Sequence, residues 1–385
     1  MDKLTIVGTF TFVILFFSVL FSFFLLTVKP KNKIGNKLLA IYFIAFAIHI
    51  SVFFYSQYIE LPSVIEMLRD QIIDLSSPLL FLYLLANIYS DFKFRLIHLL
   101  HVLPLIIGIL IFTPRFYGVS ESDRILFTEN FNSQIEVKIS YVVSTLISLF
   151  YLILMFSELK KYKTLLIENY SNTSSFNYKW LYQLTLVVSF IFAFSQCKQV
   201  YKFIGSDVDT LNLMRLLLII VLLGFLLWIV LKSMYQPELF KAIDSRHLLI
   251  TEELKKKDVV TEIDNVVKSQ IKSLERFMEE KEPFLDASLT IQKLAFQFGI
   301  PSRELSILIN HHLNQHFFDF ITTYRIKKAI TLIENPSNKN LTVLEILYDV
   351  GFNSKSPFNK AFKKHTGLTP TEYRKHLHKK DLNIK

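Results

Sequence analysis

The chain has few of the residues on which most enzyme and metal sites depend. Its 385 residues include one cysteine and nine glycines. The single cysteine, Cys197, excludes a disulfide framework, a CxxC zinc site and a cysteine redox pair within the chain. Glycine-rich phosphate loops, a dinucleotide fingerprint and a GxSxG elbow are also missing. The sequence therefore predicts a protein that is not an enzyme and holds no cofactor.

Charge is scarce over the first two-thirds of the chain, where long apolar segments follow one another. The whole chain is 51% hydrophobic with a mean hydropathy of +0.37, values too high for a soluble protein of this length. The first segment, Leu4–Val28, is uncharged and no cleavage pattern follows it, so it is expected to stay as a membrane helix. The third segment is the least regular, because Asp74 opens it and Pro78 interrupts it. The later six segments are predicted at Leu38–Ile59, Ile72–Tyr89, Leu96–Phe112, Ile139–Phe156, Leu181–Ile204 and Leu211–Leu231.

The last third of the chain has a different pattern, and its most informative stretch is 341–374. Apolar residues at helical spacing predict a short helix with one buried stripe, made of Ile346, Leu347 and Val350. Gly351 follows where a helix ends and the backbone needs a positive φ. Asn353 or Ser354 then caps a lysine-rich helix that ends at Gly367. A helix, a tight glycine turn and a basic helix are the order of a helix-turn-helix DNA reader.

An earlier stretch, 289–310, repeats this order. Gly299 makes the turn, and Ser302 is expected to cap the second helix. The residues expected to pack inward are Leu294, Ala295, Phe298, Leu305, Leu308 and Ile309. Phe317–Glu334 then reads as one long helix that connects the two units.

The run Val350–Arg374, VGFNSKSPFNKAFKKHTGLTPTEYR, resembles the second helix-turn-helix of the AraC/XylS family of bacterial transcription regulators. The resemblance extends from Asp286 onward and covers nothing before it. It implies two helix-turn-helix units on one rigid connector, with both recognition helices entering successive major-groove segments on one face of promoter DNA. It also implies RNA polymerase as a partner. Leu347 departs from the family pattern, which usually has a small alanine at that position.

The resemblance further implies which side chains face the DNA groove. The two readers are unequal, because the first also carries Glu304 and an apolar Ile307 where a polar reader is expected. Arg303 is suited to bidentate contact with guanine, whereas lysines more often reach phosphates. The predicted DNA-binding residues are Arg303, Ser306, Asn310, Lys355, Ser356, Asn359, Lys360 and Lys363. The alternative, a lysine-rich helix that is only a solvated face, does not explain the glycine turn, the caps and the doubled unit.

Positive charge is concentrated at the same end of the chain. The formal net charge is +10, and residues 351–385 hold nine Lys or Arg against Glu372 and Asp381. A site that neutralises about 6–10 phosphates would make DNA affinity fall steeply with salt. Charge alone also fits RNA or a membrane surface, so it supports the DNA interpretation only together with the motif.

A DNA reader must lie in the cytoplasm, and seven crossings then put the N-terminus outside a bacterial inner membrane. The positive-inside rule agrees, since ten Lys or Arg fall in loops assigned to the inside and five in loops assigned to the outside. The inside loops carry Lys29, Lys31, Lys33, Lys37, Lys93, Arg95, Lys160, Lys161, Lys163 and Lys179. The outside loops carry Lys3, Arg69, Arg115, Arg124 and Lys138.

Polar side chains at membrane depth are costly and often functional. His98 and His101 stand at i, i+3 on one helix face, which suits a metal, but without a third ligand interhelical hydrogen bonds are favoured and no metal is predicted. Lys198 and Arg215 fit an anionic ligand near the outer leaflet, but snorkelling to the interface or pairing with Asp207 and Asp209 fits equally well. The long outer loop 113–138 is a second place for a ligand. The candidate sensor residues are His49, Asn87, His98, His101, Lys198 and Arg215.

Residues 232–283 form the linker between the two parts of the chain. Apolar residues in Leu254–Glu280 recur at a spacing close to the helical repeat, which is typical of an amphipathic helix. Two alternatives remain open for its apolar stripe. It forms a two-stranded coiled coil in a homodimer, or it packs on the first helix of the DNA-binding domain.

The sequence therefore predicts an all-α protein in three parts. A seven-helix transmembrane sensor or anchor domain occupies 1–231, the linker 232–283, and a double helix-turn-helix domain 284–385. The predicted function is a membrane-embedded one-component transcription regulator that binds specific double-stranded DNA and senses an unknown small-molecule or membrane signal through its membrane domain. The alternatives are a transporter or enzyme-like membrane domain fused to a regulatory DNA-binding domain, and a passive membrane-tethered regulator.

Overall fold

The computed structural model describes residues 3–27, 33–172, 178–205, 207–235, 264–335, 337 and 340–382. Within these residues every regular element is a helix, apart from an isolated bridge between Tyr170 and Thr290, so the all-α prediction is confirmed. The chain divides into two compact units. The first, the membrane unit, comprises 1–160 and 177–245, and the second, the DNA-binding unit, comprises 161–176 and 246–385.

The membrane unit holds seven helical spans that are long and apolar enough to cross a bilayer, as predicted from the sequence. These spans are Ile6–Thr27, Ile34–Tyr55, Ser63–Ile88, Leu96–Tyr117, Ile135–Asn169, Tyr178–Ile204 and Val208–Lys232. The helices that build them and their connections are α1 (Lys3–Thr27), α2 (Lys33–Ile50), α3 (Val52–Tyr55), α4 (Ser63–Gln71), η1 (Ile72–Leu75), α5 (Ser76–Ile88), η2 (Leu96–Val102), α6 (Leu103–Phe112), η3 (Thr113–Tyr117), α7 (Glu121–Glu129), η4 (Phe131–Ser133), α8 (Ile135–Asn169), α9 (Tyr178–Ile204) and α10 (Val208–Tyr235).

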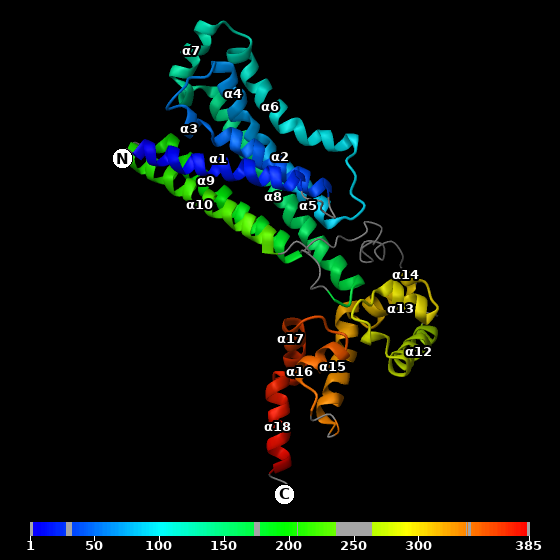
Figure 1. Ribbon diagram of the computed structural model, residues 1–385. Coiled ribbons are helices and arrows are strands. Elements are labelled where there is room, and N and C mark those ends of the chain that lie inside the picture. Colours follow the sequence, from blue (N-terminus) through cyan, green and yellow to red (C-terminus); the bar gives the residue numbers. More distant parts are fainter. Residues whose placement is uncertain are drawn as a thin grey trace. The chain divides into compact units, whose positions relative to one another are not determined.

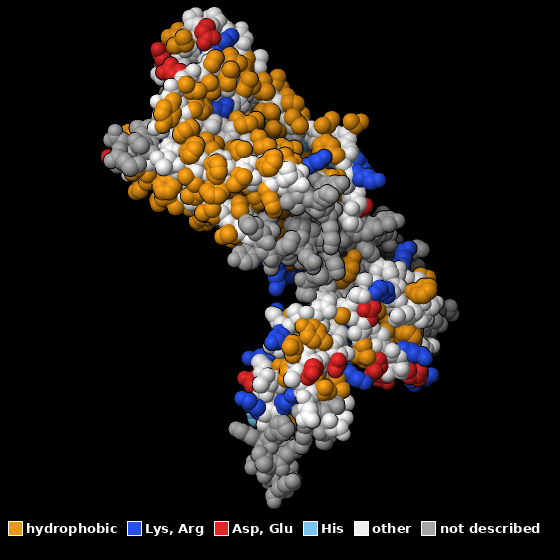
Figure 2. All heavy atoms as spheres, viewed as in Figure 1, with side chains coloured by type: hydrophobic (Ala, Val, Ile, Leu, Met, Phe, Trp, Pro, Cys, Tyr) orange, Lys and Arg blue, Asp and Glu red, His pale blue; other side chains and the backbone are white. Residues whose placement is uncertain are grey.

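Helices of the membrane unit are apolar on their outer faces as well as on their packed faces. Helix α1 packs between α2 and α10 (Figure 1). On its outer side Phe16 and Phe23 are 57% and 66% exposed. Hydrophobic side chains cover most of the face of this unit seen in Figure 2. A helix that is apolar all round is stable when lipid, not water, surrounds it, since its backbone groups are satisfied internally.

The third span differs from the prediction in where it begins and in its irregular point. It starts at Ser63 and runs through α4, η1 and α5, so it is longer than the predicted Ile72–Tyr89. Pro78 does not interrupt it, because this proline lies in the first turn of α5, where backbone N–H groups have no intrahelical partner. The irregular point is η1, a 3₁₀ turn that contains Asp74.

The stretch 113–138, predicted as a long outer loop, is largely exposed as expected but is mostly helical. Helices η3, α7 and η4 occupy it, and α8 begins within it. Phe116 and Phe127 are buried in a cluster with Phe112. The guanidinium of Arg124 donates to the carbonyl oxygens of Phe116 and Val119. Phe112, Phe116 and Phe127 thus supply a small hydrophobic core for this stretch.

The DNA-binding unit is built on one long helix, α15 (Phe317–Glu334), whose bounds are those predicted for the connecting helix. One core packs α12, α13 and η6 against the first half of α15, and a second core packs α16 and α17 against its second half. The other elements are α12 (Asp264–Lys281), η5 (Pro283–Leu285), α13 (Ile291–Phe298), α14 (Ser302–Ile307), η6 (Leu308–His312), α16 (Val343–Asp349), α17 (Lys355–Thr366) and α18 (Pro370–Leu382).

Helix α12 is the described part of the linker helix, and it distinguishes a coiled coil from intrachain packing for the apolar residues of that helix. Val267, Leu274 and Met278 are buried in the first core, and Phe277 packs on Phe298. The apolar stripe is thus occupied by intrachain packing and not by a second chain in this part of the helix. The rest of the predicted helix, 254–263, lies outside the described residues.

Candidate nucleic-acid interface

The second helix-turn-helix begins with a capping box on α16. The hydroxyl of Thr342 accepts from the backbone N–H of Glu345, and the Glu345 carboxylate accepts from the backbone N–H of Thr342 at 2.6 Å. This bonding holds the pKa of Glu345 below its ordinary value. The predicted stripe of Ile346, Leu347 and Val350 is buried, so the bulky Leu347 is accommodated in the core against α15.

The turn after α16 needs a glycine for two independent reasons. Gly351 has φ +87°, a region that side chains with a Cβ rarely adopt. A Cβ at this position would also lie 2.7 Å from the carbonyl oxygen of Leu285 and 2.8 Å from that of Phe284. The turn therefore rests directly on the backbone that follows α12.

Helix α17 presents a basic face to solvent. Ser354 occupies its N-cap position, without a side-chain capping bond. Phe358 and Phe362 are fully buried and anchor the opposite face of the helix. The side chains of the predicted readers in this helix are all exposed: Lys355, Ser356, Asn359, Lys360 and Lys363.

Two other residues of α17 contribute less to this basic face. The ammonium of Lys364 lies 3.7 Å from the carboxylate of Asp319 on α15. Desolvation and the neighbouring Lys364 charge lower the pKa of His365 from its ordinary value, which disfavours a positive charge there. The positive charge available to a ligand on this face therefore comes from Lys355, Lys360 and Lys363.

The first helix-turn-helix has the predicted order with a different cap. Thr290 caps α13 by accepting from the backbone N–H of Lys293, and Gly299 makes the turn at φ +82°. The N-cap of α14 is Pro301, which has no side-chain capping bond, so the expectation that Ser302 caps this helix is wrong. Helix α14 is followed at once by the π-helical turn η6. The predicted inward residues Leu305, Leu308 and Ile309 are buried.

The predicted readers of the first unit do not share one exposed face. Ser306 is only 2% exposed, and its hydroxyl accepts from the side-chain amide of Asn310 at 2.9 Å. The expectation that Ser306 faces the groove is therefore contradicted, because its position falls on the packed side of α14. Asn310 is half-buried, and Arg303 is exposed near the start of α14.

One residue that the sequence reasoning missed is Arg325 on α15. It is 1% exposed, and its guanidinium donates to backbone oxygens of the segment after α12, to Phe284 at 2.7 Å and to Asp286 at 2.8 Å. Burial lowers its pKa to about 10, and the nearby Asp286 charge opposes that shift, so it stays charged at pH 7. A signal was present in the sequence, since Arg325 stands four residues after Ile321 and four before Ala329 on the buried stripe.

The candidate sensor residues fall into separate groups in the membrane unit. His49 lies with Nδ1 3.2 Å from the carbonyl oxygen and 3.5 Å from the carboxylate of Asp70. Lys198 lies within electrostatic reach of both Asp70 and Arg215. His49 and Lys198 thus both lie near the carboxylate of Asp70. The guanidinium of Arg215 also donates to Asn212 at 3.2 Å.

His98 and His101 lie together but are held by hydrogen bonds. Their rings are 6.3 Å apart, and Nδ1 of His98 accepts from the backbone N–H of Arg95. Nδ1 of His101 is 2.7 Å from the hydroxyl of Tyr151 on α8. Among the described residues no group of three His, Cys, Asp or Glu could hold a metal ion. Asn87 donates to the carbonyl oxygen of Tyr83 within its own helix.

A groove between α8 and α9 was not predicted. Its volume is about 640 Å³, and both polar and apolar side chains line it. Thr145 donates to Gln196 at 3.0 Å across the two helices, and the ammonium of Lys202 lies 3.3 Å from the hydroxyl of Tyr141. No local sequence pattern could have found this groove, because its residues come together only when α8 and α9 pack.

Comparison with known protein families finds a match, and it falls in the DNA-binding unit. Residues 294–376 match a family described as a helix-turn-helix domain. The Msm operon regulatory protein of Streptococcus mutans is 30% identical over 91 residues, which are 24% of this chain and 32% of that protein. An uncharacterized HTH-type transcriptional regulator of Bacillus subtilis, YdeC, is 30% identical over 87 residues, 23% of this chain and 29% of that protein.

The match to these two relatives spans about a third of their length, and no solved structure matches the chain. The matched family covers both helix-turn-helix units from α13 into α18. The double helix-turn-helix read from the sequence is thereby confirmed at the level of the domain. The family match does not extend into the membrane unit.

Proposed function

We propose that this chain, whose residues 294–376 form a helix-turn-helix domain, is a membrane-embedded one-component transcription regulator. The observation that carries the proposal is the exposed basic face of α17, set on a glycine turn and a buried aromatic anchor. The two regulatory proteins that are similar to about a quarter of this chain support it. The doubled unit on α15 fits the AraC type, in which two recognition helices contact one face of promoter DNA.

In this proposal the two units contribute differently to DNA binding. Helix α17 supplies most of the contacts through Lys355, Ser356, Asn359, Lys360 and Lys363. Helix α14 supplies Arg303 as a base reader, since its guanidinium fork matches the two acceptors of guanine. The half-buried Asn310 orients the end of α14 through its bond to Ser306 and is a weaker candidate for contact. RNA polymerase is the partner that regulation of a promoter requires.

The membrane unit is proposed to anchor the protein and to sense the signal. Seven spans of membrane length support the bilayer as its environment. A cytoplasmic DNA-binding unit then places the N-terminus outside. The charged group around Asp70, His49 and Lys198 is the strongest candidate for the sensor, because ionisable residues at membrane depth are costly unless they are used.

Mapping of DNA bound by the full-length protein in cells tests the proposal. The test variant is Lys355→Ala/Asn359→Ala/Lys360→Ala. Its matched control is Lys272→Ala/Ser273→Ala/Lys281→Ala. This control also removes two positive charges, but from exposed positions on α12. Sharp peaks that the control keeps and the test variant loses would support sequence-specific binding through α17. Peaks that survive in the test variant, or that appear in neither protein, would contradict it.

A further inference from the structure

The buried Arg325 joins three parts of the DNA-binding unit, and one of them comes from the end of a membrane span. Two of its four hydrogen bonds go to the backbone after α12, as described above. The other two go to Ser171, from Nη1 to the carbonyl oxygen and from Nη2 to the hydroxyl, each at 3.1 Å. Ser171 itself is 2% exposed. It lies two residues after α8, a single helix of 35 residues that contains the fifth span.

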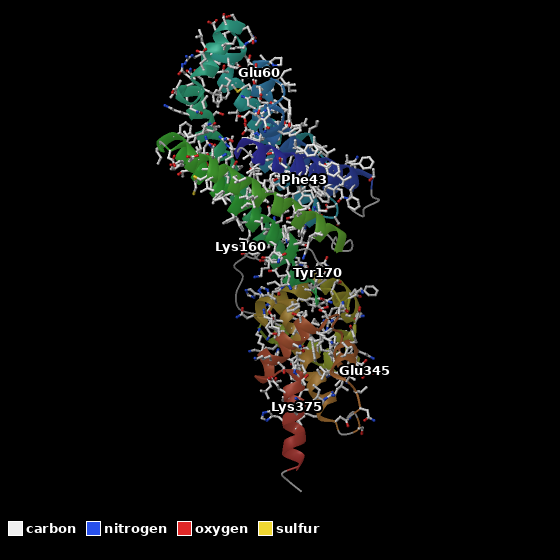
Figure 3. The ribbon with its side chains drawn as sticks, turned by 60° about the vertical axis from the view of Figure 1, so that its left-hand side comes forward. Phe43, Glu60, Lys160, Tyr170, Glu345 and Lys375 are labelled. Carbon is white, nitrogen blue, oxygen red and sulfur yellow. The ribbon has the colours of Figure 1, made fainter. Side chains whose placement is uncertain are left out.

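The segment after α8 is also bound to the DNA-binding unit through its backbone. The N–H and the hydroxyl of Ser171 both donate to the carbonyl oxygen of Leu289, at 3.2 and 2.7 Å. Tyr170 forms an antiparallel bridge with Thr290, the N-cap of α13 (Figure 3 labels Tyr170). The end of α8 is therefore attached to the start of the first helix-turn-helix.

The same guanidinium reaches the second helix-turn-helix on its other side. Its carbon lies 5.7 Å from the ring centre of Phe352, and its Nε would be 3.0 Å from a Cβ at Gly351. The Gly351 turn also rests on the carbonyls of Leu285 and Phe284, and Arg325 donates to the second of these. Contacts thus run without a gap from Ser171 through Arg325 to the turn that precedes α17.

We propose that the surface formed by Phe284–Thr290 and Arg325 is a docking site for the end of α8, and that its occupancy controls DNA binding. This inference rests on the proposed function. We call the contact of Tyr170 and Ser171 with Leu289, Thr290 and Arg325 the α8 clasp. A closed clasp holds both helix-turn-helix units in one arrangement on α15. A displacement of α8 in the membrane opens it, because the helix is continuous up to Asn169.

The physical basis is that a buried charge needs its hydrogen-bond acceptors. Ser171 provides two of the four that the structure gives to Arg325, so withdrawal of this residue leaves the guanidinium half satisfied in a buried site. The guanidinium must then turn toward water, and the Phe284 and Asp286 carbonyls lose their donor. Because an intermediate state is unfavourable, the clasp acts as a two-state element, which a switch requires.

The direction of control follows from the geometry of DNA. Two recognition helices that contact successive major-groove segments must be held at a defined spacing. If the protein fixes this spacing before it meets DNA, binding costs less conformational entropy. We therefore expect the closed clasp to be the state that binds DNA.

A disulfide across the clasp tests this in the full-length protein in lipid nanodiscs. The hydrogen bond from the N–H of Ser171 to the carbonyl oxygen of Leu289 makes Tyr170 and Thr290 a pair without mutual hydrogen bonds. In this pair type the Cα atoms are closest. The variant is Tyr170→Cys/Thr290→Cys in a Cys197→Ser background, which removes the only native cysteine. Oxidised and reduced samples of this one protein carry the same side chains, so loss of the Thr290 cap is equal in both.

The probe is fragmented genomic DNA from the cells that carry the gene, and the bound fragments are recovered and sequenced. The expected result is rapid disulfide formation within one chain and at least about fivefold higher recovery of specific fragments by the oxidised sample, the low end of typical allosteric couplings. The two single-cysteine variants, given the same oxidant, are the controls and should show no change. Ser171→Ala, which removes one donor and one acceptor of the clasp, should lower recovery relative to Ser269→Ala at an exposed position.

Several outcomes would overturn the inference, and they differ from failure of the proposed function. If no disulfide forms, the end of α8 does not dock at this site. If the disulfide forms but oxidised and reduced samples recover the same fragments equally, or the oxidised sample recovers fewer, the clasp does not promote DNA binding. If no sample, including the single-cysteine controls, recovers any specific fragment, the proposed function itself is wrong and the inference is lost with it.

Discussion

Gly351 and Gly367 both have a positive φ, but they differ in their surroundings. A Cβ at Gly351 would lie 2.7 Å from a carbonyl oxygen, whereas a Cβ at Gly367 would meet nothing within 4 Å. Gly367→Ala should cost about 1–2 kcal/mol from backbone strain alone. Gly351→Ala should cost more, because the turn must also move away from Phe284 and Leu285.

Thermal unfolding of the purified full-length variants checks this difference. Far-UV circular dichroism reports on both units, while tryptophan fluorescence reports on the membrane unit, which contains Trp180 and Trp228. Gly351→Ala should lower the midpoint seen by circular dichroism and leave the fluorescence transition unchanged. Equal midpoints for the two variants would show that the close approach at Gly351 is not needed.

Lys360 and its neighbours on α17 are exposed lysines, which usually meet phosphates. Lys360→Ala should therefore weaken binding about equally across DNA sequences and reduce the salt slope of the affinity by about 1. Binding titrations at several salt concentrations, with operator and unrelated DNA, measure both effects. A loss confined to the operator would instead identify Lys360 as a base reader.

Arg303 should behave differently if its guanidinium reads a base. Arg303→Ala is expected to cost roughly 1–3 kcal/mol on the preferred operator and to relax the preference at one position. Binding to a set of operators with single base changes would reveal this. A uniform loss over the whole set would place Arg303 on the phosphate backbone.

At the scale of elements, α12 is an amphipathic helix whose buried stripe packs on its own chain. Leu274 is fully buried in the first core of the DNA-binding unit. Leu274→Ala should lower the stability of this unit by about 2–5 kcal/mol, as for other large-to-small core changes, and should leave the oligomeric state unchanged. Urea unfolding and light scattering measure the two quantities.

The matched control is Lys272→Ala, a change at an exposed position two residues away. It should alter neither the stability of the DNA-binding unit nor the oligomeric state. If Leu274→Ala instead dissociated a dimer while the DNA-binding unit remained folded, the stripe would serve a coiled coil. That result would contradict the packing of α12 on α13 and α15.

At the scale of the whole molecule, the proposed topology puts α7 outside the cell and the loop before η2 inside. In a Cys197→Ser background, Ser122→Cys should react with a membrane-impermeant maleimide on intact spheroplasts. Lys93→Cys should react only after the membrane is opened. Both positions are exposed in the membrane unit. The reverse pattern would put the DNA-binding unit outside and exclude a role in transcription.

The sequence alone predicted those features that depend on interactions between residues close together in the chain. A helix of membrane length needs only a run of apolar residues, because its backbone bonds close within the segment. A glycine turn between two helices needs only a residue that accepts positive φ, and Gly299 and Gly351 both do. The seven spans, the connecting helix α15 and the exposed lysines of α17 could therefore be predicted from the sequence.

The tertiary structure alone decided features that depend on residues far apart in the chain. Ser306 looked available for DNA, but packing of α14 buries it against the core. Interhelical hydrogen bonds were expected for His98 and His101, but only packing identified Tyr151 on α8 as the partner of His101. Ser171 and Arg325 are separated by 154 residues, and neither carries a local signal for the other. Burial, the choice of hydrogen-bond partner and the docking of α8 all follow from long-range packing, which no periodicity in the sequence encodes.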